Sequence, residues 1–338
     1  MTRNIIKIAI TVMVGFSLFY FVVKETGFEV VVNSISLFLD WRGGLIVLVT
    51  AIIMLIGAVR WREVLHYKKE RVPLLEMFSY HIKGFTVDFL TPFAFLGGEA
   101  VRVFMIEKKV GIKKGAFSSV TDKLIGITTH LLFMTVGIIL FVLYGATQHS
   151  MLLFYAVAMI FVISCLLFLF YFQAVRKKSF LKLVFRFSSG LSNFFKNNSN
   201  GQVAVDIEKD IMSFFTHGKK ELTKGFALSV LMNIFFLIRV GLVLYFVTGQ
   251  FSLMAVMIIY GLVILSMIAP LPAAIGGMDV ILGAGFVALG FGLSAGVMAA
   301  IILRSADLVT CLVGVVLFLK MSVSSFVQEF SSFLKKGA

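Results

Sequence analysis

Residues 240–278 contain no Asp, Glu, Lys or Arg. A membrane-spanning helix needs about 20 predominantly apolar residues, so this run holds more than one segment. Four further uncharged apolar runs occupy residues 43–59, 124–146, 151–175 and 280–303. Only 14% of the 338 residues are charged, against about 25% in a typical soluble domain. We therefore predict an all-α, polytopic integral membrane protein with about seven to nine hydrophobic segments.

Other features of the sequence exclude several classes of function. The apolar segment Ile5–Val23 has a basic start but is long and lacks a following A-x-A cleavage site, so we predict a retained first helix. Cys165 and Cys311 both lie in apolar segments and suggest no metal framework. No G-x-x-x-x-G-K-[ST] loop is present, so we expect no ATP-driven transport by this chain alone. We also expect no cofactor and no nucleic-acid partner.

The net charge of +14 is unevenly placed along the chain. Lys and Arg gather in residues 60–71, 107–114 and 174–224, whereas the loops near 145–150 and 249–252 carry neither. Cytoplasmic loops of membrane proteins carry an excess of Lys and Arg. We therefore predict that the three basic segments are cytoplasmic and that the protein resides in the cell membrane.

The stretch "TPFAFLGGEAVR" (residues 91–102) lies between two of these cytoplasmic segments. Residues 72–106 must then enter the membrane and return, yet they carry several charges, each costing at least ~2.5–3.5 kcal/mol at bilayer depth. We predict a re-entrant helical hairpin with its bend at Thr91–Gly98, because non-helical backbone is tolerated there only when protein or a cavity surrounds it. The glycine pair would start a half-helix, whose N–H groups and dipole favour an anion.

The polar segment 174–224 is predicted to hold two amphipathic helices. The sequence "SFLKLVFRFSSGLSNFF" (residues 179–195) spaces apolar side chains among Lys and Arg, as in a helix lying in the membrane interface. A second such helix is predicted near Val203–Phe215. The plainer interpretation is that these helices only anchor the loop to anionic lipid.

The chain also contains an internal repeat. "GIKKGAFSSVTDKLIGITT" (residues 111–129) aligns without gaps on "GLSAGVMAAIILRSADLVT" (residues 292–310). Upstream, both copies carry Pro, Gly-Gly and an acid, and the spacing from acid to base is 24 residues in one copy and 25 in the other. Interrupted helices in repeats point to the central site of a transporter. The sequence does not decide between parallel and inverted copies.

We therefore divide the chain, treated as a single membrane domain over residues 1–338, into three parts. Repeat one covers about 43–146, the cytoplasmic amphipathic segment about 174–224, and repeat two about 225–320. Each repeat would supply one re-entrant hairpin and one cation on the following helix.

Ionisable residues within apolar segments are functional candidates by default. The candidate substrate-binding residues combine cations, acids and backbone of the two bends: Gly97, Gly98, Glu99, Arg102, Lys123, Arg239, Gly276, Gly277, Asp279 and Arg304. Each charge also has a purely structural interpretation. Arg102 can pair with Glu99, Asp279 can cap its helix, Lys123 can reach back to the interface, and Arg304 has a candidate partner in Asp307 one turn on.

Three further residues are candidates for proton coupling, namely Asp88, Asp122 and His130. His130 follows Lys123 by seven residues on the same helical face, where a buried, hydrogen-bonded histidine is the plainer interpretation. Asp122 can equally pair with a base on a neighbouring helix.

The motifs "TPFAFLGGEAVR", "PLPAAIGGMDV" and "GLSAGVMAAIILRSADLVTCLVGVV" together resemble a flippase-like membrane family. This family includes the membrane domain of lysylphosphatidylglycerol synthase and an archaeal protein of lipid-linked glycan assembly. The second motif departs from the family pattern, since Asp279 stands where Glu is usual. The resemblance implies movement of a polar-headed lipid between leaflets, and no lysyl transfer, because no segment here corresponds to the soluble synthase domain.

The prediction is a non-enzymatic protein that translocates an anionic phospholipid or a polyprenyl-phosphate-linked saccharide. Arg102, Lys123 and Arg304 would neutralise the phosphate. Two alternatives stay open: a membrane subunit that supports a lipid-modifying or glycosyl-transfer enzyme, and a membrane-embedded transferase with Asp88, Glu99 or His130 as its base.

Overall fold

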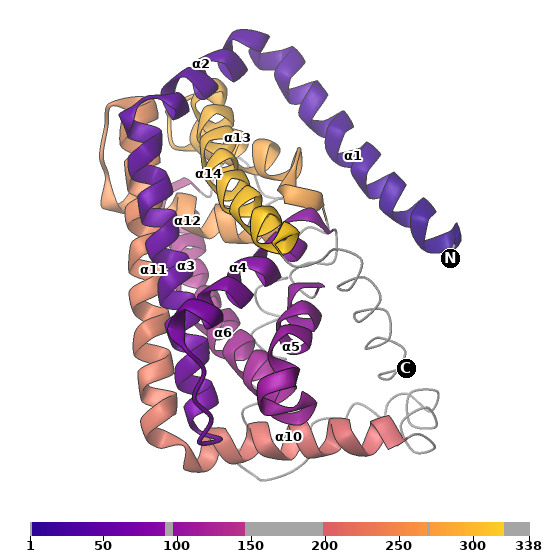
Figure 1. The fold of residues 1–338 in the computed structure, drawn as a ribbon. Coiled ribbons are helices and arrows are strands. Elements are labelled where there is room, and N and C mark those ends of the chain that lie inside the picture. The colour runs from indigo at the N-terminus through magenta and orange to yellow at the C-terminus, as the bar shows by residue number, and fades with distance from the viewer. Residues whose placement is uncertain (1, 92–96, 146–198, 269–270, 321–338) are drawn as a thin grey trace, which may run out of the picture.

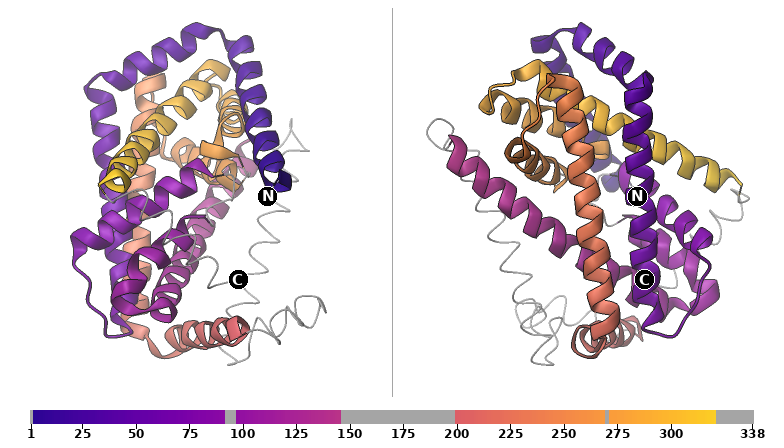
Figure 2. Two further views of the ribbon diagram at one scale, coloured as in Figure 1. Left: turned by 45° about the vertical axis from the view of Figure 1, so that its right-hand side comes forward. Right: turned by 90° about the vertical axis from the view of Figure 1, so that its left-hand side faces the viewer.

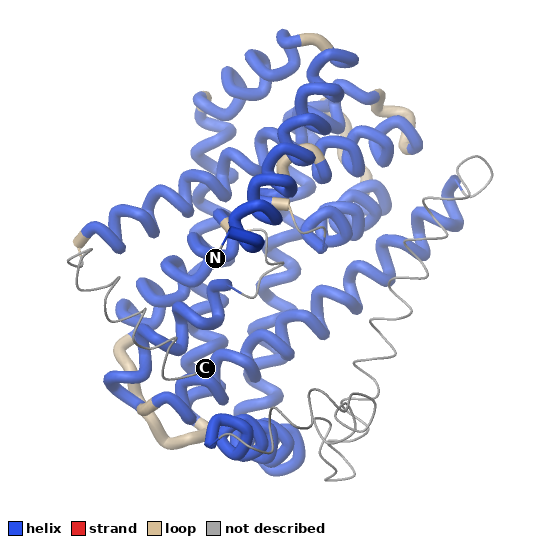
Figure 3. The backbone as a smooth tube through the Cα atoms, turned by 90° about the vertical axis from the view of Figure 1, so that its right-hand side faces the viewer, coloured by secondary structure: helices blue, strands red, loops and turns tan. Residues whose placement is uncertain are grey.

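The computed structural model describes residues 2–91, 97–145, 199–268 and 271–320. These residues form helices and turns and contain no strand (Figure 3), as the predicted all-α class requires. The helices are α1 (Thr2–Thr26), α2 (Phe28–Leu39), α3 (Trp41–His66), α4 (Leu74–Leu90), α5 (Gly97–Val110), α6 (Ile112–Gly145), α10 (Ser199–His217), α11 (Lys219–Thr248), α12 (Leu253–Ile268), the 3-10 turn η1 (Pro272–Ala274), α13 (Gly277–Ala288) and α14 (Leu293–Leu319).

Four of these helices are long and apolar enough to cross a membrane: Trp41–His66, Ile112–Leu143, Lys219–Thr248 and Leu293–Leu319. Three shorter apolar helices cover Phe28–Leu39, Leu253–Ile268 and Pro272–Ala288. The uncharged run at 240–278 is divided between α11 and α12, as its length requires. The predicted count of seven to nine segments stays a prediction, because the run at 151–175 and the helix predicted from "SFLKLVFRFSSGLSNFF" lie outside the described residues.

Helices α3 and α11 pack side by side in opposite directions (Figures 1 and 2). At one end, the ring of Trp41 at the start of α3 lies 5.6 Å from that of Phe246 near the end of α11. At the other end, Lys224 of α11 pairs with Glu63 of α3 at 3.1 Å. Contacts at both ends therefore fix the antiparallel arrangement of the first long helices of the two proposed repeats.

Helices α4 and α5 form a hairpin at the predicted place. Lys109 near the end of α5 pairs with Glu76 near the start of α4, and the N–H of Gly98 donates to Asp88 Oδ1 near the end of α4 at 2.8 Å. The two helices approach so closely that a Cβ on Gly98 would lie 2.3 Å from the Gly84 carbonyl oxygen. The bend residues 92–96 themselves lie outside the described residues.

The second repeat also interrupts its apolar stretch. Helix α12 ends at Ile268, and the short turn η1 precedes α13, which begins at Gly277. Gly276 has φ +78°, a conformation that favours glycine. A Cβ there would also lie 2.4 Å from the carbonyl oxygen of Gly15, because α1 packs directly on this bend.

The helix before each interruption packs against a long helix of the other proposed repeat. Helix α4 contacts α14, and helix α12 contacts α6. The second crossing brings small residues together, since a Cβ on Gly137 of α6 would lie 2.2 Å from the Met257 carbonyl oxygen. The end of α4 also contacts η1, so these two described segments lie close to one another.

The segments predicted to be cytoplasmic gather at one end of the molecule, where α10 lies crosswise (Figure 1). Lys68 pairs with Asp210 of α10 at 2.6 Å, and Lys113 pairs with Asp206 of α10 at 3.2 Å. Arg60 differs from the other basic residues of segment 60–71. It is buried inside the helix bundle, with 5% of its surface exposed, because it has a buried carboxylate partner on α6.

Candidate functional site

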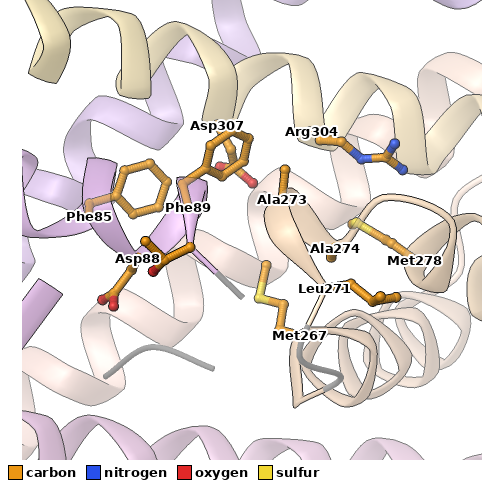
Figure 4. Close-up of a pocket in the computed structure, with 11 residues that line it drawn as sticks. Phe85, Asp88, Phe89, Met267, Leu271, Ala273, Ala274, Met278, Arg304 and Asp307 are labelled. Carbon is orange, nitrogen blue, oxygen red and sulfur yellow. The ribbon is translucent and has the colours of Figure 1, made fainter. Parts of the chain in front are cut away.

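A small cavity lies between the end of α4 and η1 (Figure 4). Its walls come from the end of α4, the end of α12, η1, the start of α13 and the middle of α14. The lining residues are Phe85, Asp88, Phe89, Thr91, Met267, Leu271, Ala273, Ala274, Met278, Arg304 and Asp307. The cavity volume is ≈ 70 Å³. Most of the lining is apolar, and its three charged side chains are one guanidinium and two carboxylates.

The guanidinium belongs to Arg304, which pairs with the buried Asp279 at 2.5 Å. The same Asp279 oxygen accepts the N–H of Gly276 at 2.9 Å, so one carboxylate holds both the start of α13 and the arginine of α14. Arg304 Nε and Asp279 Oδ1 are buried and have no hydrogen-bond partner among the described residues. The pair therefore retains an open donor and an open acceptor beside the cavity.

Asp307 is held from the opposite side by Arg239 of α11. The guanidinium lies 2.8 Å from Asp307 Oδ1 and donates a second bond of 2.6 Å to the carbonyl oxygen of Leu303. The Arg239 side chain is only 2% exposed. Arg239 therefore positions Asp307 and does not line the cavity.

The carboxylate of Asp88 lies at the start of α5. Besides accepting the Gly98 N–H, it lies 3.6 Å from Lys123 Nζ on α6. Lys123 also lies 3.2 Å from Glu99 of α5, and Glu99 in turn accepts a hydrogen bond from Ser119. Lys123 therefore lies between two carboxylates, one of which lines the cavity.

This group continues into a buried ion network. Arg102 lies 3.3 Å from Glu99 and 3.4 Å from Asp122. Asp122 has no exposed surface, and it receives two bonds from Arg60 of α3, at 2.6 Å and 3.2 Å. Arg60 also donates to Ser229 of α11 at 2.9 Å. We call Arg60, Arg102, Lys123, Asp88, Glu99 and Asp122 the first charged cluster.

His130 belongs to a separate buried contact. Its Nδ1 lies 2.9 Å from the hydroxyl of Tyr260 on α12, and that hydroxyl donates to Asn233 of α11. His130 does not line the cavity. The contact joins α6, α12 and α11. It agrees with the plainer interpretation of His130 as a hydrogen-bonded structural residue.

Comparison with protein families shows to which family the chain belongs. The family described as "Lysylphosphatidylglycerol synthase TM region" matches residues 4–314. The chain belongs to this family. Comparison with curated proteins and with solved structures gives no significant match. Membership in the lysylphosphatidylglycerol synthase membrane-region family, together with the four long apolar helices, establishes a multi-pass membrane protein associated with lipid metabolism or transport.

The candidate residues predicted from the sequence of this family member do not all lie at the cavity. Asp88 and Arg304 line the cavity. Lys123 does not line it and lies 3.6 Å from the Asp88 carboxylate. Arg102 pairs with Glu99, as its structural interpretation requires. The backbone N–H groups of Gly98 and Gly276 are occupied by Asp88 and Asp279, respectively, so the two helix starts already hold carboxylates of the protein.

Two partnerships differ from those considered from the sequence. Arg304 pairs with Asp279 and not with Asp307 one turn on, because Asp307 points to Arg239. The sequence analysis did not predict that Arg60 lies inside the helix bundle. Arg60 directly follows an uncharged run and therefore resembles the first basic residue of a cytoplasmic loop. The only sequence signal for it is Asp122, a buried acid that requires a base.

Proposed function

We propose that the chain translocates a phosphate-bearing lipid, either an anionic phospholipid or a polyprenyl-phosphate-linked saccharide, across the cell membrane without catalysing a chemical reaction. One observation carries this proposal: the two interrupted helices of the repeats meet at a cavity lined by Arg304. Ionisable side chains are rare in membrane interiors and mark substrate paths. Transporter sites lie where broken helices of two repeats meet.

Arg304 is the first group that we assign to the phosphate. Guanidinium groups recognise phosphate oxygens through several donors in a fixed plane. The Nε of Arg304 is buried without a partner, so a phosphate oxygen would satisfy it. Lys123, behind Asp88, would supply a second positive charge, while Phe85, Phe89 and the methionines line the apolar wall on which the start of a lipid tail would lie.

The antiparallel packing of α3 and α11 supports an inverted arrangement of the two repeats. In such an arrangement, one hairpin starts from each side of the membrane, and both bends reach the middle. The cavity between them would then open to either side through small movements of one repeat against the other, as in other transporters built from inverted repeats. We propose re-entrant geometry for both hairpins on the same ground.

Lipid mass spectrometry on the purified protein tests the proposal. We expect one class of phosphate-bearing lipid to co-purify with the wild type and to be lost in Arg304→Ala. Arg42→Ala is the matched control, because Arg42 forms an exposed pair with Asp40 at 3.1 Å far from the cavity. If wild type, Arg304→Ala and Arg42→Ala all carry the same bulk lipid mixture, Arg304 is a structural ion-pair residue. The role of a membrane subunit for a lipid-modifying enzyme then becomes the better proposal.

A further inference from the structure

The cations near the proposed site are already balanced by carboxylates. The first charged cluster contains Arg60, Arg102 and Lys123 against Asp88, Glu99 and Asp122. On the other side of the cavity, Arg304 pairs with Asp279 and Arg239 pairs with Asp307. A phosphate that binds here therefore adds a negative charge to a neutral set of ion pairs. Such a charge inside the membrane is costly unless a proton neutralises it.

Asp88 is the carboxylate whose pairing with Lys123 a bound phosphate would replace. It accepts the N–H at the start of α5 and faces Lys123, which are the two interactions that a helix N-terminus and a lysine offer to an anion. It also lines the cavity directly (Figure 4). Its 3.6 Å distance to Lys123 is the longest among the ion pairs of the first charged cluster.

The other carboxylates are held by shorter or additional contacts. Asp279 is bound at 2.5 Å by Arg304 and caps its own helix. Asp122 is bound by Arg60 through two bonds, at 2.6 Å and 3.2 Å. Glu99 lies between Arg102 and Lys123 and accepts from Ser119. Asp307 is bound at 2.8 Å by Arg239.

We infer that binding of the phosphate is linked to the uptake of one proton by Asp88, an inference that rests on the proposed function. The proton comes from the aqueous phase and forms an O–H bond on the Asp88 carboxylate. The ion pair between Asp88 and Lys123 breaks, and Lys123 pairs with the phosphate. The neutral acid still accepts the Gly98 N–H through its carbonyl oxygen, so α5 remains capped. The net charge of the interior is the same before and after binding.

Charged groups come from α5, α14 and α3, which pack against α4. Helix α5 contributes Glu99 and Arg102, and helix α14 contributes Arg304 and Asp307. Helix α3 contributes the buried Arg60, whereas η1, which also contacts α4, has no ionisable side chain. Lys123 and Asp122 reach the first charged cluster from α6. Helix α4 itself carries Glu76, His81 and Lys83. The other charges of the first charged cluster, and the pairs Arg304–Asp279 and Arg239–Asp307, are already matched. We therefore assign the change of charge to Asp88.

The linkage predicts that the affinity for the lipid rises as the pH falls. With one proton taken up per lipid, the apparent Kd changes by up to about tenfold per pH unit. The test is calorimetric titration of the full-length protein with dihexanoyl phosphatidylglycerol at pH 7 in buffers of different ionisation enthalpy. The slope of the observed heat against buffer enthalpy counts the protons, and the phosphodiester itself remains ionised.

We expect uptake of one proton in the wild type and none in Asp88→Asn. The affinity of Asp88→Asn for the lipid should be the same at pH 6 and at pH 8. Asp206→Asn, at a surface pair, should retain the uptake. Asp88→Glu, which keeps a carboxyl group, should also retain it.

Binding by the wild type without proton uptake would overturn the inference while leaving the proposed function intact. Unchanged uptake in Asp88→Asn would overturn the assignment to Asp88. A wild type that shows no binding at all would refute the proposed function, and this inference with it.

Discussion

At the first bend, the carboxylate that caps the helix comes from another helix, whereas at the second bend it comes from the helix that it caps. Asp88 of α4 accepts the N–H of Gly98 in α5. Asp279 of α13 accepts the N–H of Gly276 just before the same helix. A cap supplied from another helix can leave without unwinding the helix that it caps. A cap within the helix, fixed further by Arg304, is part of the local fold.

The ion pairs around the two bends differ in the same way. Around the first bend, Arg60, Arg102 and Lys123 all belong to a single connected cluster. Lys123 and Arg102 each contact two carboxylates. Around the second bend, Arg304–Asp279 and Arg239–Asp307 are separate short pairs. A connected cluster can exchange partners when a phosphate arrives, whereas isolated pairs hold their geometry. In the proposed function, the first bend would therefore be the adaptable half of the site and the second bend the fixed half.

The largest expected effect tests how far the connected cluster stabilises the fold. Asp122→Ala removes the partner shared by Arg60 and Arg102 and leaves guanidinium charges buried. Breaking a buried ion pair by removing one partner costs about 3–5 kcal/mol. We expect a large drop in the thermal unfolding midpoint in detergent. The control Asp210→Ala removes one partner of a surface pair with Lys68, whose contribution is about 0–1 kcal/mol. Equal midpoints for the two variants would contradict the distinction.

This cluster also shows what the sequence could and could not provide. The hairpin was predictable, because Pro92, the glycine pair and several charges interrupt an apolar region. Helix α5 indeed begins at Gly97. The partner of Asp122 was not predictable, because Arg60 lies 62 residues away and directly follows an uncharged run. Sequence spacing identifies neighbours along one helix, whereas pairing between helices depends on how the helices cross.

The second bend gives the same lesson. Asp307 lies one turn from Arg304 and is a reasonable partner by helical spacing. Arg239 of α11 instead takes Asp307, and Arg304 turns to Asp279, which is 25 residues away. The spacing of 25 residues from acid to base, noted in the repeat, thus coincides with an ion pair that the sequence analysis did not predict. The substrate-binding roles of these residues stay predictions.

A smaller effect is expected from tightening the first bend. A Cβ on Gly98 would lie 2.3 Å from the Gly84 carbonyl oxygen, so α4 and α5 must move apart in Gly98→Ala. Overpacking of this kind costs about 1–3 kcal/mol. We expect a lower unfolding midpoint and weaker lipid binding, because Asp88 loses its position at the start of α5. Gly44→Ala is the control, since its Cβ would meet nothing within 4 Å. Normal stability and binding in Gly98→Ala would refute the close contact.

The smallest expected effect is at α10, which we predict to lie outside the membrane. The hydrogen bond from Lys113 lowers the pKa of the Asp206 carboxyl below its ordinary value. Because the pKa is lower in the folded state than in the unfolded state, the pair stabilises α10 at neutral pH and loses this effect as the pH falls through the lowered pKa. Wild type should therefore unfold at a slightly higher temperature than Asp206→Asn at pH 7. The difference should shrink and disappear as the pH falls through that lowered pKa. A difference that persists in acid would have another cause.

Exchange of a lipid between leaflets tests the central claim most directly. Proteoliposomes would contain tail-labelled fluorescent phosphatidylglycerol in both leaflets, and dithionite would bleach the label in the outer leaflet. With wild type and with the Arg42→Ala control, we predict that bleaching also removes the inner-leaflet label, because the lipid crosses during the assay. With Arg304→Ala/Lys123→Ala, the inner-leaflet label should remain protected. Equal bleaching with wild type and the double variant, or protection with wild type, would contradict a lipid path between the two bends.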